Sequence, residues 1–130
     1  MREYKPTAEP IAIVDDDAPL CEALGSVLKA AGFAIATYAS AEEFLAAPQQ
    51  QDTACLILDI RLPEMNGIEL QRELTAMQSQ IPIIFVSAHG DDSVRDLVMK
   101  AGAAAFLSKP VRSASLLKEI ARALEARNAE

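Results

Sequence analysis

The sequence predicts an α/β fold in which an open, doubly wound parallel sheet is covered by helices on both faces. Short apolar runs alternate with stretches of helical periodicity, five times over. Most of these runs are apolar at consecutive positions, which is typical of strands buried on both faces. The chain has 130 residues, of which 51% are hydrophobic, and this suits one domain with a core of its own.

Five apolar runs are the predicted strands, and each leads into a predicted helix. The runs lie at 11–14, 33–36, 54–58, 81–86 and 104–107. Short connections join the predicted strands and helices into βα units, so right-handed crossovers between successive strands are expected. Such units place every strand parallel to its neighbours.

The helices are predicted from apolar stripes and capping residues. The first stripe covers residues 20–31 and ends before Gly32, and glycine is common just after the last residue of a helix. Ser40-Ala41-Glu42-Glu43 has the spacing of a capping box and predicts a short second helix. The remaining stripes lie at 70–77, 94–101 and 116–124.

Composition excludes several classes of protein. Twelve basic against 19 acidic residues give a net charge of −7, so direct binding to nucleic acid by this chain is not expected. No apolar run approaches the roughly 20 residues of a membrane span. The N-terminus lacks the apolar stretch of a signal peptide, and a cytoplasmic protein is expected.

The same reasoning gives one domain with loose ends. Residues 1–9 are expected to form a tail, 10–126 the domain, and 127–130 a frayed end or the start of a linker. Cys21 and Cys55 form no metal or redox motif, so both are expected to be buried, reduced core residues.

Side chains able to carry chemistry follow four of the predicted strands. Asp15 and Asp16 follow the first strand, Asp59 the third, Ser87 the fourth and Lys109 the fifth. In open α/β sheets, ligands bind at the carboxyl ends of the strands, so these groups are expected to converge. The next residue, Asp17, precedes Ala-Pro and is expected to cap the first helix instead.

Charge predicts what such a pocket would hold. Two carboxylates about 4 Å apart repel by about 4 kcal/mol at an effective dielectric near 20. Asp15, Asp16 and Asp59 together would therefore take up protons or hold a cation. Oxygen ligands suit Mg²⁺, while Lys109 and the Ser87 hydroxyl suit an anion. Together, these groups can support phosphoryl transfer to a carboxylate oxygen.

Four segments carry a resemblance to a known family: Ile13–Asp17, Leu56–Gly67, Ile83–Ala88 and Ala101–Pro110. Over about residues 10–126, the sequence resembles the receiver domain of bacterial two-component response regulators. The resemblance implies a flavodoxin-like (βα)5 three-layer sandwich with strand order 2-1-3-4-5. It also implies a cis bond between Lys109 and Pro110.

The resemblance assigns a role to each site residue. Asp59 would be the phosphoacceptor, taking the phosphoryl group from a phosphohistidine of a sensor histidine kinase. Asp16 would bind Mg²⁺ directly, Asp15 through water, and the backbone carbonyl of Arg61 would be a further ligand; Mn²⁺ could substitute. Lys109 would pair with the phosphoryl oxygens. The chain would promote its own phosphorylation and dephosphorylation and would not be an enzyme acting on other substrates.

The resemblance further implies a switch pair, Ser87 and Phe106. The hydroxyl would move toward the new phosphate and the ring would rotate behind it. This would alter the face made by the segments around 94–101, 104–107 and 116–124, and a phosphorylated homodimer through that face is expected. The family more often has Thr and Tyr at the switch positions. His89 would either control water at the phosphate or be a solvated loop residue.

The residues around 87–91 resemble receivers that precede a helix-turn-helix domain, so the N-terminal part of a transcription regulator is expected. A stand-alone regulator and a receiver-like module without phosphorylation are the alternatives. An FMN carrier is disfavoured because Asp15, Asp16 and Asp17 would repel its phosphate. An aspartate-based phosphatase is disfavoured because Arg61 stands where its acid would be.

Overall fold

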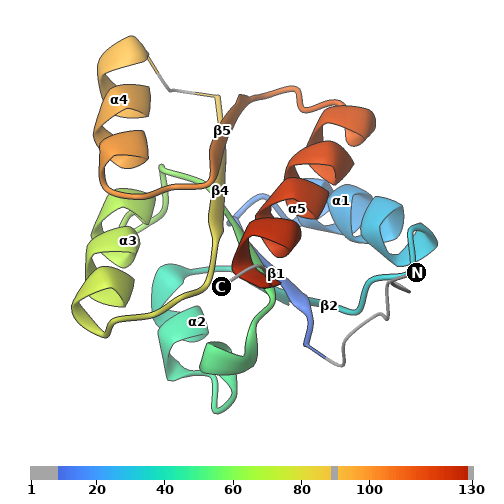
Figure 1. Cartoon of the computed structure of the whole chain (residues 1–130), viewed down its shortest axis with the longest axis horizontal. Coiled ribbons are helices and arrows are strands. Elements are labelled where there is room, and N and C mark those ends of the chain that lie inside the picture. The colour runs from blue at the N-terminus through green and yellow to red at the C-terminus, as the bar shows by residue number, and fades with distance from the viewer. Residues whose placement is uncertain (1–8, 89–90, 129–130) are drawn as a thin grey trace.

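The computed structural model describes residues 9–88 and 91–128 (Figure 1). Strands and helices alternate along this part of the chain, with one short 3-10 helix at Gln50–Asp52. The strands are β1 (Ile11–Val14), β2 (Ile35–Tyr38), β3 (Cys55–Leu58), β4 (Ile83–Ser87) and β5 (Ala105–Ser108). The helices are α1 (Ala18–Ala30), α2 (Ala41–Ala46), α3 (Gly67–Ala76), α4 (Asp92–Lys100) and α5 (Ser113–Asn128).

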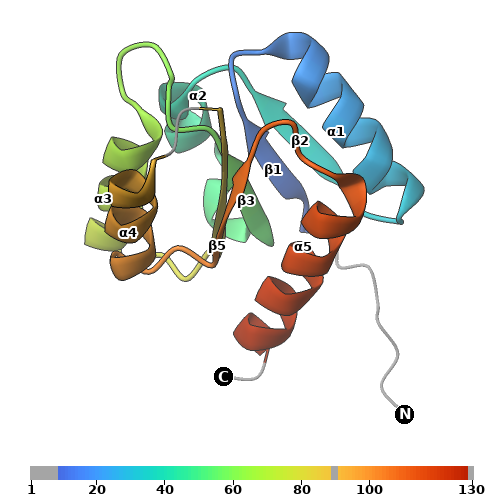
Figure 2. The same ribbon diagram turned by 90° about the horizontal axis from the view of Figure 1, so that it is seen from above.

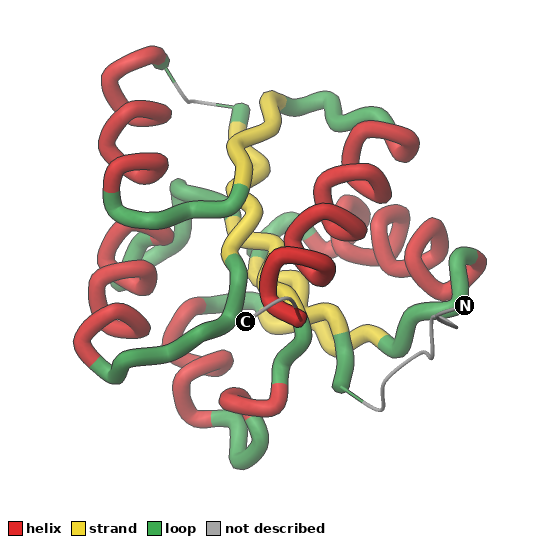
Figure 3. The backbone as a smooth tube through the Cα atoms, viewed as in Figure 1, coloured by secondary structure: helices red, strands yellow, loops and turns green. Residues whose placement is uncertain are grey.

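The strands form one sheet that runs through the middle of the molecule (Figure 3). Within the described residues it has five strands in the order β2-β1-β3-β4-β5, and every pair is parallel. The register places Val14 beside Leu58 and Leu58 beside Phe85. The predicted doubly wound fold and its strand order are confirmed.

Helices cover the sheet on both sides, α1 and α5 on one face and α2, α3 and α4 on the other (Figure 1). Alternate strand residues point to opposite layers. Ala12 and Val14 pack with Phe44 of α2 and Leu70 of α3. Ile11 and Ile13, which alternate with them on β1, pack with α1 and α5. Because both faces are buried, consecutive positions are apolar, and this produces the runs seen in the sequence.

The second strand lies two residues later than its apolar run predicts, at Ile35–Tyr38 instead of 33–36. The end of α1 explains the shift. Gly32 has a φ of 98°, and the amides of Gly32 and Phe33 donate to the carbonyls of Lys29 and Leu28. This Schellman ending uses residues 32 and 33 to stop the helix, so the strand starts only after them.

Two predicted helix caps form, one of them in altered geometry. The Asp17 carboxylate accepts from the Leu20 amide at 3.1 Å, which confirms its capping role. Ser40 accepts from the Glu43 amide, but the Glu43 carboxylate accepts from the amide of Ala39 and not from that of Ser40. A reciprocal capping box is present at the start of α3 instead, between Asn66 and Glu69.

The carboxyl ends of the strands lie together at the upper edge of the molecule in Figure 2, where the loops that follow β1, β3 and β5 are grouped. Asp15 follows β1, Asp59 follows β3 and Lys109 follows β5, so the fold brings these side chains to a common edge. Among the described residues, no helix has both the length and the apolar character needed to cross a membrane.

Gly25 and Gly67 are both buried, but they differ in what an added side chain would contact, and this difference predicts their effect on stability. A Cβ at Gly67 would lie 2.2 Å from the backbone oxygen of Asp59, whereas a Cβ at Gly25 would lie 2.6 Å from the terminal methyl of Ile35. The Ile35 side chain can rotate to move its methyl group away, but the backbone carbonyl of Asp59 cannot move in this way. We expect Gly67→Ala to lower the free energy of unfolding by about 3 kcal/mol.

Gly25→Ala is the matched control, because it also places alanine at a tight helical position. Its higher helix propensity, about 1 kcal/mol, offsets much of the repacking, so the net change is expected to stay within about 1 kcal/mol. Urea unfolding of both variants checks the prediction. Equal losses in the two variants would show that the contact with Asp59 is not the constraint.

Candidate metal and phosphoacceptor site

Three carboxylates converge at the carboxyl ends of β1 and β3. Asp15, Asp16 and Asp59 each offer an oxygen, and these oxygens lie within 4.8 Å of one another. Asp15 and Asp59 are buried, and Asp16 is exposed. Because β1 and β3 are adjacent and in register, the residues that follow them meet at the sheet edge. Three oxygen donors open to solvent on one side fit a hard divalent cation such as Mg²⁺.

Lys109 bridges the two buried carboxylates. Its Nζ lies 3.0 Å from Oδ2 of Asp15 and 3.3 Å from Oδ2 of Asp59. Lys109 follows β5, which is separated from β3 by β4, so its side chain reaches across one strand. The bond from Lys109 to Pro110 is cis, as the family resemblance implies. The structure thus brings together Asp15, Asp16, Asp59 and Lys109, four of the five groups that the sequence predicts to converge. The fifth, Ser87, lies at the end of β4.

The environment of the cluster raises the pKa of both Asp15 and Lys109, for different reasons. Burial raises the pKa of Asp15, and the charge of Asp59 adds to the increase, against the lowering effect of the Asp17 amide and Lys109. Burial acts to lower the pKa of Lys109, but the hydrogen bond to Asp15 and the charges of Asp59 and Asp15 outweigh it and raise the value. The ammonium group is thus held charged between the carboxylates.

The Asp59 carboxylate is fixed on both of its oxygens. Oδ1 accepts from the amide of Ile60 at 2.7 Å, and Oδ2 faces Lys109. The backbone beneath it is also held, because the Gly67 amide donates to the Ile60 carbonyl at 2.8 Å. The carboxylate therefore has a defined orientation before any ligand arrives.

The two predicted switch residues lie on β4 and β5. Ser87 ends β4 and is fully buried, and its backbone carbonyl accepts from the amide of Lys109 at 3.0 Å. Phe106 on β5 is 9% exposed and packs beside Phe85, with ring centroids 6.5 Å apart. The Arg95 guanidinium lies 5.3 Å from the centre of the Phe106 ring. In this structure the ring is turned inward and covered by a cation from α4.

The remaining predicted site residues lie on loops. Arg61 is exposed on the segment between β3 and α3, between Ile60 and Leu62, which are both buried. The burial of these neighbours anchors the backbone that carries Arg61 near Asp59. His89 lies outside the described residues.

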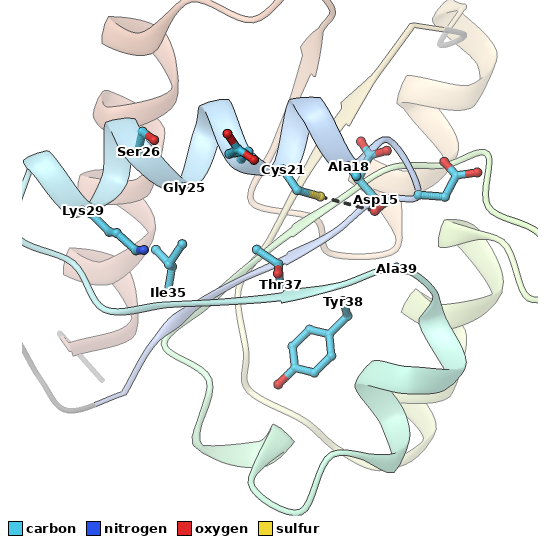
Figure 4. Close-up of a pocket in the computed structure, with 12 residues that line it drawn as sticks. Asp15, Ala18, Cys21, Gly25, Ser26, Lys29, Ile35, Thr37, Tyr38 and Ala39 are labelled. Atoms are coloured by element: carbon cyan, nitrogen blue, oxygen red, sulfur yellow. Dashed lines mark hydrogen bonds between the residues drawn. The ribbon is translucent and has the colours of Figure 1, made fainter.

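A groove between α1 and β2 opens beside the acidic cluster (Figure 4). Cys21 is one of the residues that line it, and the thiol donates to the backbone carbonyl of Asp15 at 3.3 Å. Burial, followed by the charge of Asp15, raises the pKa of Cys21. Burial raises the pKa of Cys55 to about 12. Both thiols are buried and unpaired with each other, as predicted, and Cys21 helps to hold the end of β1.

Two residues near the site are missed by sequence reasoning. The Glu42 carboxylate accepts from the Met65 amide at 2.9 Å, and Arg95 covers Phe106. The sequence around Glu42 indicates a helix start, and nothing in it predicts the contact with the Met65 amide 23 residues away. Arg95 lies on an amphipathic helix and has no local pattern that relates it to a ring on β5.

Comparison with known proteins gives a consistent result. The family model for the response regulator receiver domain matches residues 11–121. The response regulator protein TodT of Pseudomonas putida is 42% identical over 125 residues, which cover 96% of this chain and 55% of TodT. TmoT of Ectopseudomonas mendocina is 45% identical over 88% of this chain and 52% of its own length. The chain thus spans about half the length of these relatives.

Solved structures agree in fold and in sequence. The crystal structure of FixJ-N has a TM-score of 0.82 and 38% identity, and the match covers 92% of this chain and 95% of that one. The response regulator StyR has a TM-score of 0.84 and 42% identity over 94% of this chain and 62% of its own. With its parallel sheet, its acidic cluster and its bridging lysine, this chain belongs to the response regulator receiver domain family.

Proposed function

We propose that Asp59 accepts a phosphoryl group from a phosphohistidine of a sensor histidine kinase. Asp15, Asp16, Asp59 and the backbone carbonyl of Arg61 would hold Mg²⁺ there, with Mn²⁺ able to substitute. The observation that carries the proposal is the position of Lys109 between the carboxylates of Asp15 and Asp59, at 3.0 and 3.3 Å. The Lys109 ammonium group, which offsets part of the negative charge of the pocket, can then contact an incoming phosphoryl oxygen.

The chemistry follows from these positions. A carboxylate oxygen of Asp59 forms the new P–O bond as the N–P bond to the donor histidine breaks. A bound divalent cation would neutralise charge on the transferring group. Lys109 would turn toward the phosphoryl oxygens, while the bond from the Ile60 amide keeps the Asp59 carboxylate aligned. The domain supplies the acceptor and promotes the transfer; it is a signalling module that modifies itself.

The new charge would be transmitted through Ser87 and Phe106. An aspartyl phosphate adds negative charge and acceptor oxygens beside β4, to which the Ser87 hydroxyl can donate. Movement of Ser87 changes the packing around Phe106 and so the surface of α4, β5 and α5. A homodimer through this surface is the proposed output of the phosphorylated domain.

The relatives suggest the wider setting. FixJ of Rhizobium meliloti, described as a transcriptional regulatory protein, is 38% identical over 88% of this chain and 56% of its own length. We propose that this domain regulates transcription in the cytoplasm as the N-terminal part of such a regulator, with residues 10–126 as the receiver unit. DNA would be bound by another domain, consistent with the net charge of −7 here. A stand-alone regulator is the alternative.

Phosphorylation by a small donor tests the proposal directly. Acetyl phosphate or phosphoramidate with Mg²⁺ is expected to add one labile group of about 80 Da, the mass of HPO₃, to Asp59. Peptide mass spectrometry after borohydride trapping locates it, with Asp59→Asn and chelator-treated protein as controls. An unmodified Asp59, or a modification elsewhere, would favour a binding module that is not phosphorylated.

Relief of charge repulsion at Asp59 is testable without phosphate. Asp59→Asn removes one of two buried carboxylates that repel each other, while Lys109 keeps its bond to Asp15. The metal-free variant is expected to gain roughly 1 kcal/mol in free energy of unfolding and to bind Mg²⁺ more weakly. Urea unfolding in chelator and calorimetric Mg²⁺ titration measure both effects. Asp52→Asn, at an exposed acid, is the control; a less stable metal-free Asp59 variant would contradict the charge argument.

The relay through Ser87 predicts a separation of two effects. Ser87→Ala removes the hydroxyl but leaves the acidic cluster and Lys109 in place, so phosphorylation should remain within about threefold. Dimerisation that depends on phosphorylation should weaken by about tenfold, because one phosphate contact is lost. Sedimentation of phosphorylated protein measures it, with Ser26→Ala, which removes an exposed hydroxyl on α1 outside the proposed dimer surface, as control. Undiminished dimerisation would remove Ser87 from the relay.

A further inference from the structure

The loop between β3 and α3 carries the residues around the proposed phosphoryl site. It begins at Asp59 and ends at Asn66, which caps α3. The bond from the Gly67 amide to the Ile60 carbonyl closes its base, and Leu62 is buried within it. Its outer part, including Arg61 and Glu64, is exposed. Arg61 itself lies between the buried residues Ile60 and Leu62, three positions before Glu64. A change in the conformation of the outer part can therefore reach the Arg61 peptide along the chain.

Within this loop, backbone strain lies at Glu64. Its φ of 62° lies in the left-handed region, which residues other than glycine and asparagine rarely adopt. A strained conformation persists only where the surrounding structure fixes it. The next residue, Met65, provides the fixing contact: its amide donates to Oε2 of Glu42 at 2.9 Å.

Glu42 makes this contact from another element, 23 residues away in the sequence. It lies in the first turn of α2 and is half-buried. Capping of α2 is performed by its neighbours, because Ser40 accepts from the Glu43 amide and Glu43 accepts from the Ala39 amide. The Glu42 carboxylate is therefore directed to the loop and not to its own helix. A hydrogen bond to a charged acceptor is stronger than one between neutral groups.

We propose that Glu42 is a positioning residue for the metal site. Its carboxylate accepts a hydrogen bond from the Met65 amide and so stabilises the left-handed conformation of Glu64 in the outer part of the β3–α3 loop. This keeps the Arg61 peptide in one position beside Asp59. This inference rests on the proposed function, since it assigns Glu42 a role in Mg²⁺ binding. It adds a contact from α2 to a site otherwise built from β1, β3 and β5.

Calorimetric titration of the full chain with Mg²⁺ tests the role of the hydrogen bond. Glu42→Ala is expected to raise the Kd for Mg²⁺ about fivefold, a part of what a charged hydrogen bond contributes. Glu42→Gln keeps an acceptor oxygen and should stay within about twofold of the unaltered protein. Glu43→Ala removes a carboxylate from the same helical turn and should also leave the Kd within about twofold.

Two outcomes of this titration overturn the inference. If Glu42→Gln weakens binding as much as Glu42→Ala, the effect is one of net charge. If Glu43→Ala weakens it equally, the effect belongs to α2 in general. Glu42→Asp keeps the charge and the helix start but is one methylene shorter, so it should behave like Glu42→Ala and provides the measurement if the alanine variant does not fold.

Hydrogen exchange of the Met65 amide separates this inference from the proposed function. Exchange in metal-free protein should accelerate about tenfold or more in Glu42→Ala and Glu42→Asp and stay unchanged in Glu43→Ala. Accelerated exchange with an unchanged Mg²⁺ Kd would overturn the positioning role alone. Failure of the unaltered protein to bind Mg²⁺ at all would overturn the proposed function, whatever the exchange rates.

Discussion

The site depends on the contact of Lys109 with two buried carboxylates. Asp15 and Asp59 lie at the ends of adjacent strands and share a cluster with Asp16, which spans less than 5 Å. Burial of such charges is costly unless a cation compensates them. Lys109 supplies that cation at 3.0 and 3.3 Å, from the segment after β5, a strand that pairs with neither β1 nor β3. The ion pairs therefore tie the end of β5 to the ends of β1 and β3.

This tie gives a physical route from charge to conformation. The Lys109 amide donates to the carbonyl of Ser87, and Ser87 pairs with Ser108 in the parallel register of β4 and β5. In the proposed switch, a change in where the Lys109 ammonium group is directed would act through these contacts on the strand that carries Phe106. The ring packs on Phe85 and under Arg95, so its inward position has support from both β4 and α4. Two packed arrangements of this ring would make the coupling bistable.

The sequence predicts the parts of this molecule that follow local rules. Strands buried on both faces are apolar at consecutive positions, and the ligand-edge rule for parallel sheets brings Asp59 and Lys109 together, although 50 residues separate them. The start of β2 is missed because the Schellman ending of α1 at Gly32 takes up part of the apolar run. The contact between Glu42 and Met65 is missed because a carboxylate near a helix start has a sufficient local explanation. Contacts of this kind depend on how separate elements pack against each other. No periodic pattern in a single sequence predicts that packing.

The two constraints on the site, charge repulsion in the cluster and backbone strain in the β3–α3 loop, have different physical origins. The first depends on carboxylates and Lys109, and solvent ions screen its exposed part. The second depends on Glu64 in a left-handed turn and on the bond that holds Met65. Under the proposed role of Glu42, a substitution in α2 would change the position of the Arg61 carbonyl, the proposed backbone ligand, while every acidic side chain of the cluster is kept. If both constraints set metal affinity, receivers with identical acidic clusters can still differ in Mg²⁺ affinity through the residue that holds this loop.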